Sequence, residues 1–176
     1  IFKYFPLCII LPLYSQIGGL NTFEFVNLNT SPKTAALGGY VTSIMDNDVN
    51  NGVYNPALIN HLMNHVLVLN YTGYYDNIVY GDVGYCFDLW NNNLLTSMKF
   101  IDYGQFVETN EFGQNIGSFN AGEYLFSIGS SKSVIDSLFL VGVNVKLAYS
   151  SLYEFNSLGM LLDLGVSYNF PNNNIT

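Results

Sequence analysis

The chain has 176 residues, of which 49% are hydrophobic and 16% aromatic but only 10% charged, whereas about a quarter of the residues of a soluble domain carry charge. Its five lysines, lack of arginine and net charge of −8 exclude the basic surface that nucleic-acid binding requires. Downstream of the N-terminus, no run of about 18 apolar residues offers a membrane-spanning helix. The composition favours the half-apolar strands of a membrane β-barrel, with a soluble β-sandwich as the alternative.

Residues 1–15 have the pattern of a secretory signal peptide. Lys3 supplies the positive start, an apolar run occupies residues 5–13, and Ser15 is a small residue at the expected cleavage point. The run is too short to cross a bilayer as a helix. We therefore expect export, and a buried first strand is the alternative interpretation of this run.

Residues 16–64 mix small residues, turn formers and short apolar pieces. The pair Gly38-Gly39 is expected to permit tight backbone packing. Residues 56–62 predict a helical turn, with Asn55 as its cap and Pro56 at its first position. This irregular pattern predicts a compact N-terminal plug and not a spanning strand.

From residue 65 onward, in the part of the chain expected to supply barrel strands (residues 65–176), the pattern changes to runs with a period of two, the period of a β-strand. The pattern is clear in residues 78–89, 137–150 and 156–170 and weaker in residues 66–75, 94–103 and 120–131. These runs are about 10 to 14 residues long, whereas a globular strand has about 5 to 6 and a membrane-spanning strand about 9 to 11. Their length predicts an all-β fold, an antiparallel transmembrane β-barrel.

The two faces of these runs differ in charge. One face is almost free of charged residues, as lipid contact demands. The other carries Asp82, Asp88, Asn144, Lys146 and Asp163, which suit a wet lumen and would be costly in a dry sandwich. Aromatic residues near the ends of the runs predict girdles at the membrane interfaces. They are Tyr71, Tyr74, Tyr75, Tyr149, Tyr168 and Phe170.

The connections between the runs alternate in length. Residues 76–77 and 90–93 are short turns, whereas residues 104–119 are expected to form a long, acidic loop. Short turns on one side and long loops on the other are typical of outer-membrane barrels. We expect about six to seven strands, fewer than the eight or so that close such a barrel. The sequence therefore predicts the N-terminal portion of a larger barrel, incomplete as it stands.

No catalytic, cofactor or metal site is expected. His61 and His65 stand four residues apart, but Leu62 occupies the position at which a zinc protease has its glutamate. Residues 46–50 begin like a calcium loop but lack its glycine and its final acid, so we expect Asx turns there. No nucleophile and base pair stands out, and the chain is not expected to be an enzyme.

Several pieces of the chain together resemble the PorQ family of type IX secretion system proteins. Residues 19–28 (GLNTFEFVNL) are similar to the mature N-terminus of that family, and residues 35–39 (AALGG) and 55–58 (NPAL) follow at similar intervals. Residues 103–108 (YGQFVE) and 110–113 (NEFG) are similar as well. The likeness extends from about residue 18 to about residue 166, although Asn-Pro-Ala alone is shared with fatty-acid-transporter-type barrels.

The resemblance implies a fatty-acid-transporter-like barrel of about fourteen strands with an N-terminal plug, in the outer membrane of Gram-negative bacteria. It implies work with the cell-surface complex that attaches secreted proteins carrying a C-terminal signal domain. The implied partners are PorU, PorV, PorZ and the lipid of the outer membrane. The chain departs from the family in length, because roughly the second half is missing.

These observations predict a non-enzymatic barrel subunit of a secretion and attachment machine. Its family-like plug residues are Gly38, Gly39, Asn55, Pro56 and Ala57. Its candidate partner loop consists of Tyr103, Gly104, Phe106, Glu108, Glu111 and Gly113. A transporter of hydrophobic small molecules shares the fold and the Asn-Pro-Ala segment, so it is the alternative function.

Overall fold

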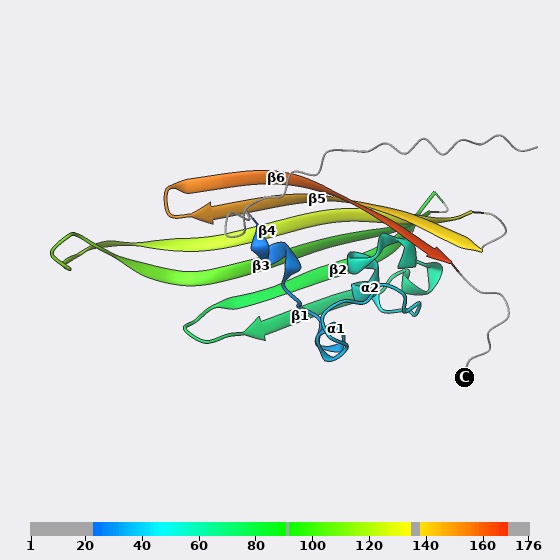
Figure 1. Cartoon of the computed structure of the whole chain (residues 1–176), viewed down its shortest axis with the longest axis horizontal. Helices are drawn as coiled ribbons and strands as arrows, with labels where there is room; N and C mark the ends of the chain where they lie inside the picture. Colours follow the sequence, from blue (N-terminus) through cyan, green and yellow to red (C-terminus); the bar gives the residue numbers. More distant parts are fainter. Residues whose placement is uncertain (1–22, 91, 135–137, 169–176) are drawn as a thin grey trace, which may run out of the picture.

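The computed structural model describes residues 23–90, 92–134 and 138–168, which include one six-stranded antiparallel sheet (Figure 1). The strands are β1 (Leu67–Gly73), β2 (Val79–Leu89), β3 (Asn92–Thr109), β4 (Asn115–Val134), β5 (Phe139–Leu152) and β6 (Phe155–Tyr168). Each strand pairs with its neighbours in the sequence, and β1 and β6 form the two edges. The described strands thus form an open antiparallel meander. The predicted signal peptide, residues 1–15, lies outside the described residues.

Short helices precede the sheet (Figure 1). They are η1 (Glu24–Asn27), α1 (Pro32–Ala36), α2 (Val49–Tyr54), η2 (Pro56–Leu58) and η3 (His61–Met63). Of these, η1, α2, η2 and η3 contact one face of the sheet. At η2, the Asn55 side chain accepts a hydrogen bond from the Ala57 amide at 3.0 Å, and Pro56 is the first helical residue. This arrangement confirms the predicted cap and the start of the turn. The turn is not continuous over residues 56–62, because η2 ends at Leu58 and η3 begins at His61. Residues 23–64 are called the N-terminal segment below.

The side chains of the strands alternate between a covered face, which the N-terminal segment contacts, and an open face. On β5, the buried side of this alternation consists of Gly142, Asn144, Lys146, Ala148 and Ser150, and the residues between them are exposed. The middle of β4 shows the same alternation. These strands confirm the period of two and the division into faces that the sequence predicts.

Apolar side chains join the N-terminal segment to the covered face in two clusters. One cluster consists of Val49, Ile59, Met63, Cys86 and Leu95, and the other of Phe25, Ile101, Leu125 and Ala148. Each cluster combines residues of the segment with residues of the strands. Complete burial of a large apolar side chain contributes about 1.5–3 kcal/mol, so apolar burial is a major part of what holds the segment to the sheet.

Two lysines on the covered face have polar partners. Lys99 Nζ donates to the carbonyl oxygens of Val26 and Leu28 at 3.0 and 2.7 Å. Lys146 forms an ion pair with Asp163 across β5 and β6 at 2.6 Å. Such partners offset the desolvation of a buried charge. Because the carbonyl oxygens that Lys99 binds belong to the N-terminal segment, this lysine ties the segment to β3.

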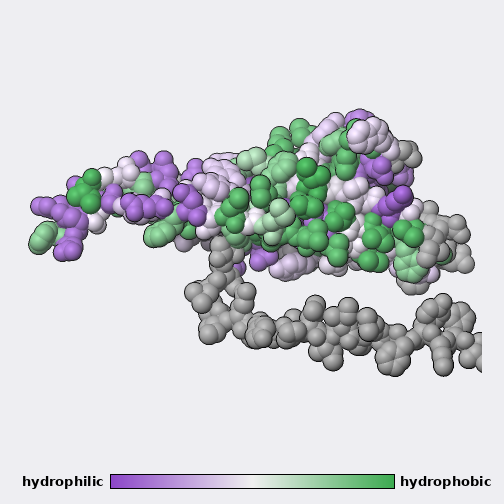
Figure 2. All heavy atoms as spheres, turned by 90° about the horizontal axis from the view of Figure 1, so that it is seen from above, coloured by the Kyte–Doolittle hydropathy of each residue, from purple (hydrophilic) through white to green (hydrophobic). Residues whose placement is uncertain are grey.

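The open face is apolar over most of its area. Its exposed side chains include Leu69, Val83, Met98, Phe126, Ile128, Val145, Leu147, Met160 and Leu164. Figure 2 shows hydrophobic residues gathered over the body of the molecule and hydrophilic residues on the projecting hairpin. Among the described strand residues, the charged ones on this face are Asp102 and Lys132, which lie near opposite ends. None of the described helices is long and apolar enough to cross a membrane.

Two strands are longer than the sequence pattern predicts. The runs expected at residues 94–103 and 120–131 lie in β3 and β4, but β3 continues to Thr109 and β4 begins at Asn115. The prediction of a long loop over residues 104–119 is therefore wrong. Most of that stretch belongs to a β-hairpin, and only residues 110–114 form the turn.

Candidate functional site

The projecting end of the β3–β4 hairpin contains all the predicted contact residues (Figure 1). Tyr103, Gly104, Phe106 and Glu108 lie in β3, and Glu111 and Gly113 lie in the turn. The pairing of β2 with β3 begins at Val79 opposite Asp102, and that of β5 with β4 ends at Leu152 opposite Ala121. The hairpin continues past both positions. Among the described residues, its two outer edges therefore have no strand partner beyond them.

Asn110 organises the turn at the hairpin tip. Its Oδ1 accepts hydrogen bonds from the amides of Phe112 and Gln114 at 3.0 and 2.9 Å, and its carbonyl accepts from the Gly113 amide at 2.9 Å. Gly113 has a φ of +75°, which glycine adopts without the steric penalty of a Cβ. These local contacts close the turn and leave Glu111 exposed at the tip.

A β-bulge marks the base of the hairpin. The register between β3 and β4 shifts between Asp102 and Gln105. Gly104 has a φ of +79°, and its amide donates to Asp102 Oδ1 at 2.8 Å. A bulge interrupts the alternation of side chains and bends the strand. This is the physical reason that residues beyond 103 have the sequence pattern of a loop although they continue the strand.

Aromatic rings form an apolar notch on the covered side of the hairpin base. The notch has a volume of about 330 Å³ and is lined by Tyr103, Phe106, Phe119, Ala121, Leu152 and Tyr153. Phe119 stacks on Phe106 with 5.3 Å between ring centroids and meets the Tyr153 ring edge-on at 4.7 Å. The Tyr153 hydroxyl donates to Glu108 at 2.7 Å, and this hydrogen bond raises the pKa of Tyr153. These contacts fix the β5–β6 turn against the hairpin.

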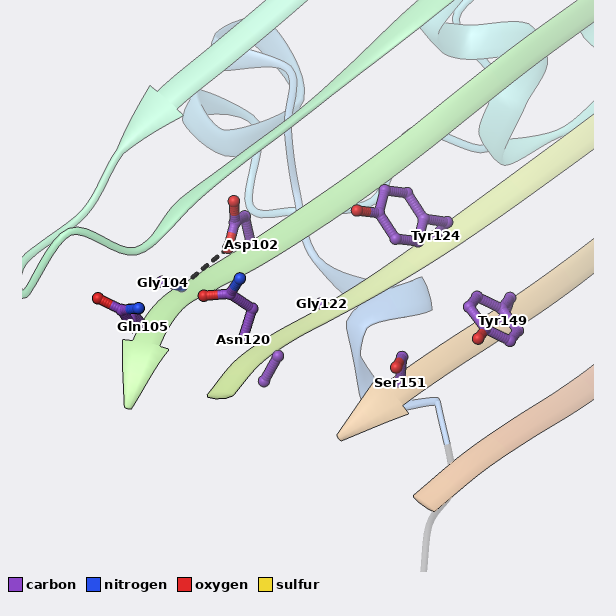
Figure 3. A pocket seen from close by; sticks show the side chains of 9 residues that line it. Asp102, Gly104, Gln105, Asn120, Gly122, Tyr124, Tyr149 and Ser151 are labelled. Carbon is purple, nitrogen blue, oxygen red and sulfur yellow. Dashed lines mark hydrogen bonds between the residues drawn. The ribbon is translucent and has the colours of Figure 1, made fainter. Parts of the chain in front are cut away.

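A polar pocket lies at the same level of the sheet, beside the open face (Figure 3). It has a volume of about 460 Å³ and is lined by Asp102, Gly104, Gln105, Asn120, Ala121, Gly122, Tyr124, Tyr149 and Ser151. Asp102 is the one charged residue of this lining. The pocket can therefore receive a polar or cationic group.

The charged residues at this end of the described structure are acidic. They are Asp76, Asp102, Glu108, Glu111, Glu123 and Glu154. Glu123 is buried and accepts a hydrogen bond from the Tyr103 hydroxyl at 2.7 Å. Residues 71–78, 100–126 and 147–160 include no lysine, arginine or histidine. The hairpin end thus presents an acidic surface, which favours encounter with a basic partner.

The Asn55-Pro56-Ala57 segment rests on two glycines of the sheet. Gly142 on β5 and Gly165 on β6 are register partners. A Cβ on Gly142 would collide with the backbone of Pro56 and Ala57, and one on Gly165 would collide with Asn55 Oδ1. Because both positions lack a side chain, η2 reaches the strands directly. The structure thus brings this predicted plug motif into contact with the sheet.

Gly38 and Gly39 do not share this contact. They follow α1 with φ values of +94° and +97°, and the Gly39 amide donates to the Thr34 carbonyl at 2.9 Å. A Cβ on Gly38 would meet nothing within 4 Å. The tight packing predicted for this pair is therefore wrong, and the two glycines instead provide the left-handed conformation that ends the helix.

The Asx turns predicted for residues 46–50 are present. Asp46 Oδ1 accepts from the Asp48 amide at 2.9 Å, and Asp48 Oδ1 accepts from the Asn50 amide at 3.0 Å. Lys33 pairs with both carboxylates, at 2.5 and 3.2 Å. Burial raises the pKa of Asp46, but the hydrogen bonds from Lys33 and the Asp48 amide outweigh it and lower the pKa. Within the described residues, no group of His, Cys, Asp and Glu is arranged to hold a metal ion.

Sequence reasoning did not identify Asp102, Tyr153 or the glycine pair as parts of these contacts. The period of two places Gly142 and Gly165 on the covered face, but their pairing depends on the register of β5 and β6. Tyr153 is distant in sequence from Glu108, and only the hairpin geometry joins them. No family model, curated protein or solved structure matches the chain.

Proposed function

We propose that the chain is the N-terminal portion of an outer-membrane β-barrel, with the open face toward lipid. The observation that carries this proposal is the apolar open face, on which the charged residues of the described strands lie near the two ends. A soluble protein rarely exposes so extensive an apolar surface. On the covered face, the N-terminal segment would then occupy the lumen as a plug.

Aromatic residues lie in rows near both ends of the open face. Strand pairing places Tyr71, Phe100, Tyr124 and Tyr149 in one row. At the other end, Phe139 and Tyr168 are register partners with ring centroids 4.8 Å apart. Two rows of this kind correspond to the aromatic girdles at the interfaces of a membrane barrel.

The distance between these rows matches a bilayer. Tyr149 and Phe139 are about ten residues apart along β5, or about 33 Å at roughly 3.3 Å per residue. With a strand tilt of about 40°, this length gives a height of roughly 25 Å, which is the height of the apolar band in outer-membrane barrels. The rows therefore have the spacing that a lipid-facing band requires.

The connections indicate how the proposed barrel is oriented. The hairpin turns β1–β2, β3–β4 and β5–β6 lie at one end of the sheet, and β2–β3 and β4–β5 are joined at the other (Figure 1). Outer-membrane barrels have short periplasmic turns and longer extracellular loops. The projecting β3–β4 hairpin therefore belongs on the extracellular side.

We further propose that the protein is a non-enzymatic subunit of the type IX secretion system that helps attach secreted proteins to the cell surface. The proposal rests on the resemblance to the PorQ family, whose similar residues 103–108 and 110–113 lie in the projecting hairpin. Contact with surface partners such as PorU, PorV and PorZ would be made through this hairpin.

Deletion of residues 105–117 in the producing bacterium tests this function. We expect the variant to stay in the outer membrane but to lose recovery of surface partners and of surface-attached cargo. Asp76→Asn, in the β1–β2 turn, is the matched control and is expected to retain both. Unchanged recovery of partners by the deletion variant would contradict the proposed function.

A groove at the opposite end favours the alternative, transport of hydrophobic small molecules. It has a volume of about 460 Å³, and its lining combines apolar side chains, such as Met45, Leu62 and Leu140, with Lys132. A deletion strain with impaired uptake of hydrophobic molecules and normal cargo attachment would support transport. Lost attachment with normal uptake would support the secretion function.

A further inference from the structure

The hairpin end contains a step where β4 continues and β5 has ended. β5 pairs with β4 as far as Leu152 opposite Ala121. β4 extends beyond that point over residues 115–120, still paired with β3 on its other side. No described strand pairs with this part of β4 on the β5 side. An extended peptide can occupy such a free edge by main-chain hydrogen bonding, as in β-strand addition.

The two pockets described above flank this step on opposite faces of the sheet. The apolar notch contains Phe119, Leu152 and Tyr153 on the covered side. The polar pocket contains Asn120 and Asp102 on the open side (Figure 3). A strand that prolongs the line of β5 would direct successive side chains to the two faces in turn. One side chain would enter the notch and the next would enter the polar pocket.

The charges around the step are acidic. Asp102 lies in the polar pocket, and Glu154 is in the turn that follows β5. Glu108 lies over Gly117, with its Oε2 3.1 Å from the position that a Cβ on that glycine would occupy. The basic side chains of an incoming strand would point to the open face and complement Asp102 there. Glu108 lies on the covered face, where it accepts a hydrogen bond from the Tyr153 hydroxyl, and with Glu154 it adds to the negative field that would repel an acidic strand.

We propose that residues 115–120 of β4 bind an extended segment of a partner protein in which apolar and basic residues alternate. The segment adds as an antiparallel strand in line with β5. Its apolar side chains fill the notch, and its basic side chains face Asp102. This inference rests on the proposed function, because it specifies how the projecting hairpin would recognise a surface partner.

Binding of synthetic peptides to the purified protein in detergent micelles tests the proposal. The probe is a short peptide in which valine and lysine alternate. One control peptide alternates valine and glutamate, and the other is the basic peptide with N-methyl groups on alternate backbone nitrogens. We expect the basic peptide to bind and both controls to bind at least about tenfold more weakly, because strand addition requires free amides and the surface is acidic.

Two protein variants locate the binding position. Asp102→Asn is expected to weaken binding about two- to fivefold at low salt, as is usual for an exposed charge pair, and Asp88→Asn on β2 is its matched control. Leu152→Trp is expected to fill the notch and to weaken binding more strongly. Equal binding of the N-methylated peptide, or unchanged binding by Leu152→Trp, would overturn the proposal.

The outcomes separate this inference from the proposed function. If deletion of residues 105–117 abolishes partner recovery but the basic peptide does not bind, the hairpin recognises its partner in another way and the inference fails alone. If the peptide binds as expected but the deletion leaves partner recovery unchanged, strand addition stands and the proposed function fails.

Discussion

At the scale of single residues, two glycines determine how closely the N-terminal segment approaches the sheet. Gly142 and Gly165 leave room for the backbone of residues 55–57, and a side chain at either position would occupy the same space. The period of two in the sequence indicates which face of the sheet these glycines lie on. Their contact partner could not be predicted, because it depends on strand register and on the path of the segment.

Gly142→Val is expected to destabilise the protein by about 1–3 kcal/mol, the usual cost of overpacking. The valine would displace η2 from β5, since its Cβ would collide with the backbone of Pro56 and Ala57. Gly73→Val is the matched control, because a Cβ there meets nothing within 4 Å. Urea unfolding in detergent micelles measures both changes, and equal effects of the two substitutions would refute the contact.

The ion pairs of Lys33 make the N-terminal segment sensitive to acid. The pKa of Asp46 is lowered in the folded state, so its contribution to stability is present above the usual carboxyl pKa of about 4 and is lost as the pH falls through the lowered value. The pair is partly exposed, so we expect a contribution of about 0.2–1 kcal/mol. Unfolding of wild type and Asp46→Asn between neutral and acid pH measures it. A constant difference across that range would contradict the expectation.

At the scale of elements, the β3–β4 hairpin shows where sequence patterns succeed and where they fail. The runs at residues 94–103 and 120–131 are strands, as their alternation predicts. Beyond residue 103, the bulge at Gly104 breaks the alternation, and residues such as Asn110 and Gly113 are typical of turns. The continued pairing of the two strands is not visible in the local pattern, because it arises between residues on different strands.

Gly113→Val is expected to loosen the hairpin tip. A φ of +75° costs a residue with a side chain about 1–2 kcal/mol, so amide hydrogen exchange near the tip should accelerate about 5- to 30-fold. Glu111→Val in the same turn is the matched control, because the φ of Glu111 is not positive and valine adopts that conformation without the same strain. Equal exchange rates in the two variants would show that Gly113 does not determine the turn.

At the scale of the whole molecule, the two faces of the sheet have different chemistry. The covered face combines apolar clusters with paired charges, and the open face exposes apolar side chains between two aromatic rows. The alternation of the strands predicts both faces. Which side the N-terminal segment covers follows from the packing of Val49, Ile59 and Met63 against the strands, which the sequence pattern does not reveal.

Spin labels along β5 test most directly whether the open face contacts lipid. Single cysteines at residues 143–148, with both native cysteines replaced by alanine, would be labelled in protein reconstituted into bilayers. We predict that labels at Val143, Val145 and Leu147 collide frequently with oxygen and rarely with a water-soluble nickel reagent, while labels at Asn144 and Lys146 collide little with oxygen. Frequent nickel collisions at the three apolar positions would place the open face in water and contradict the barrel.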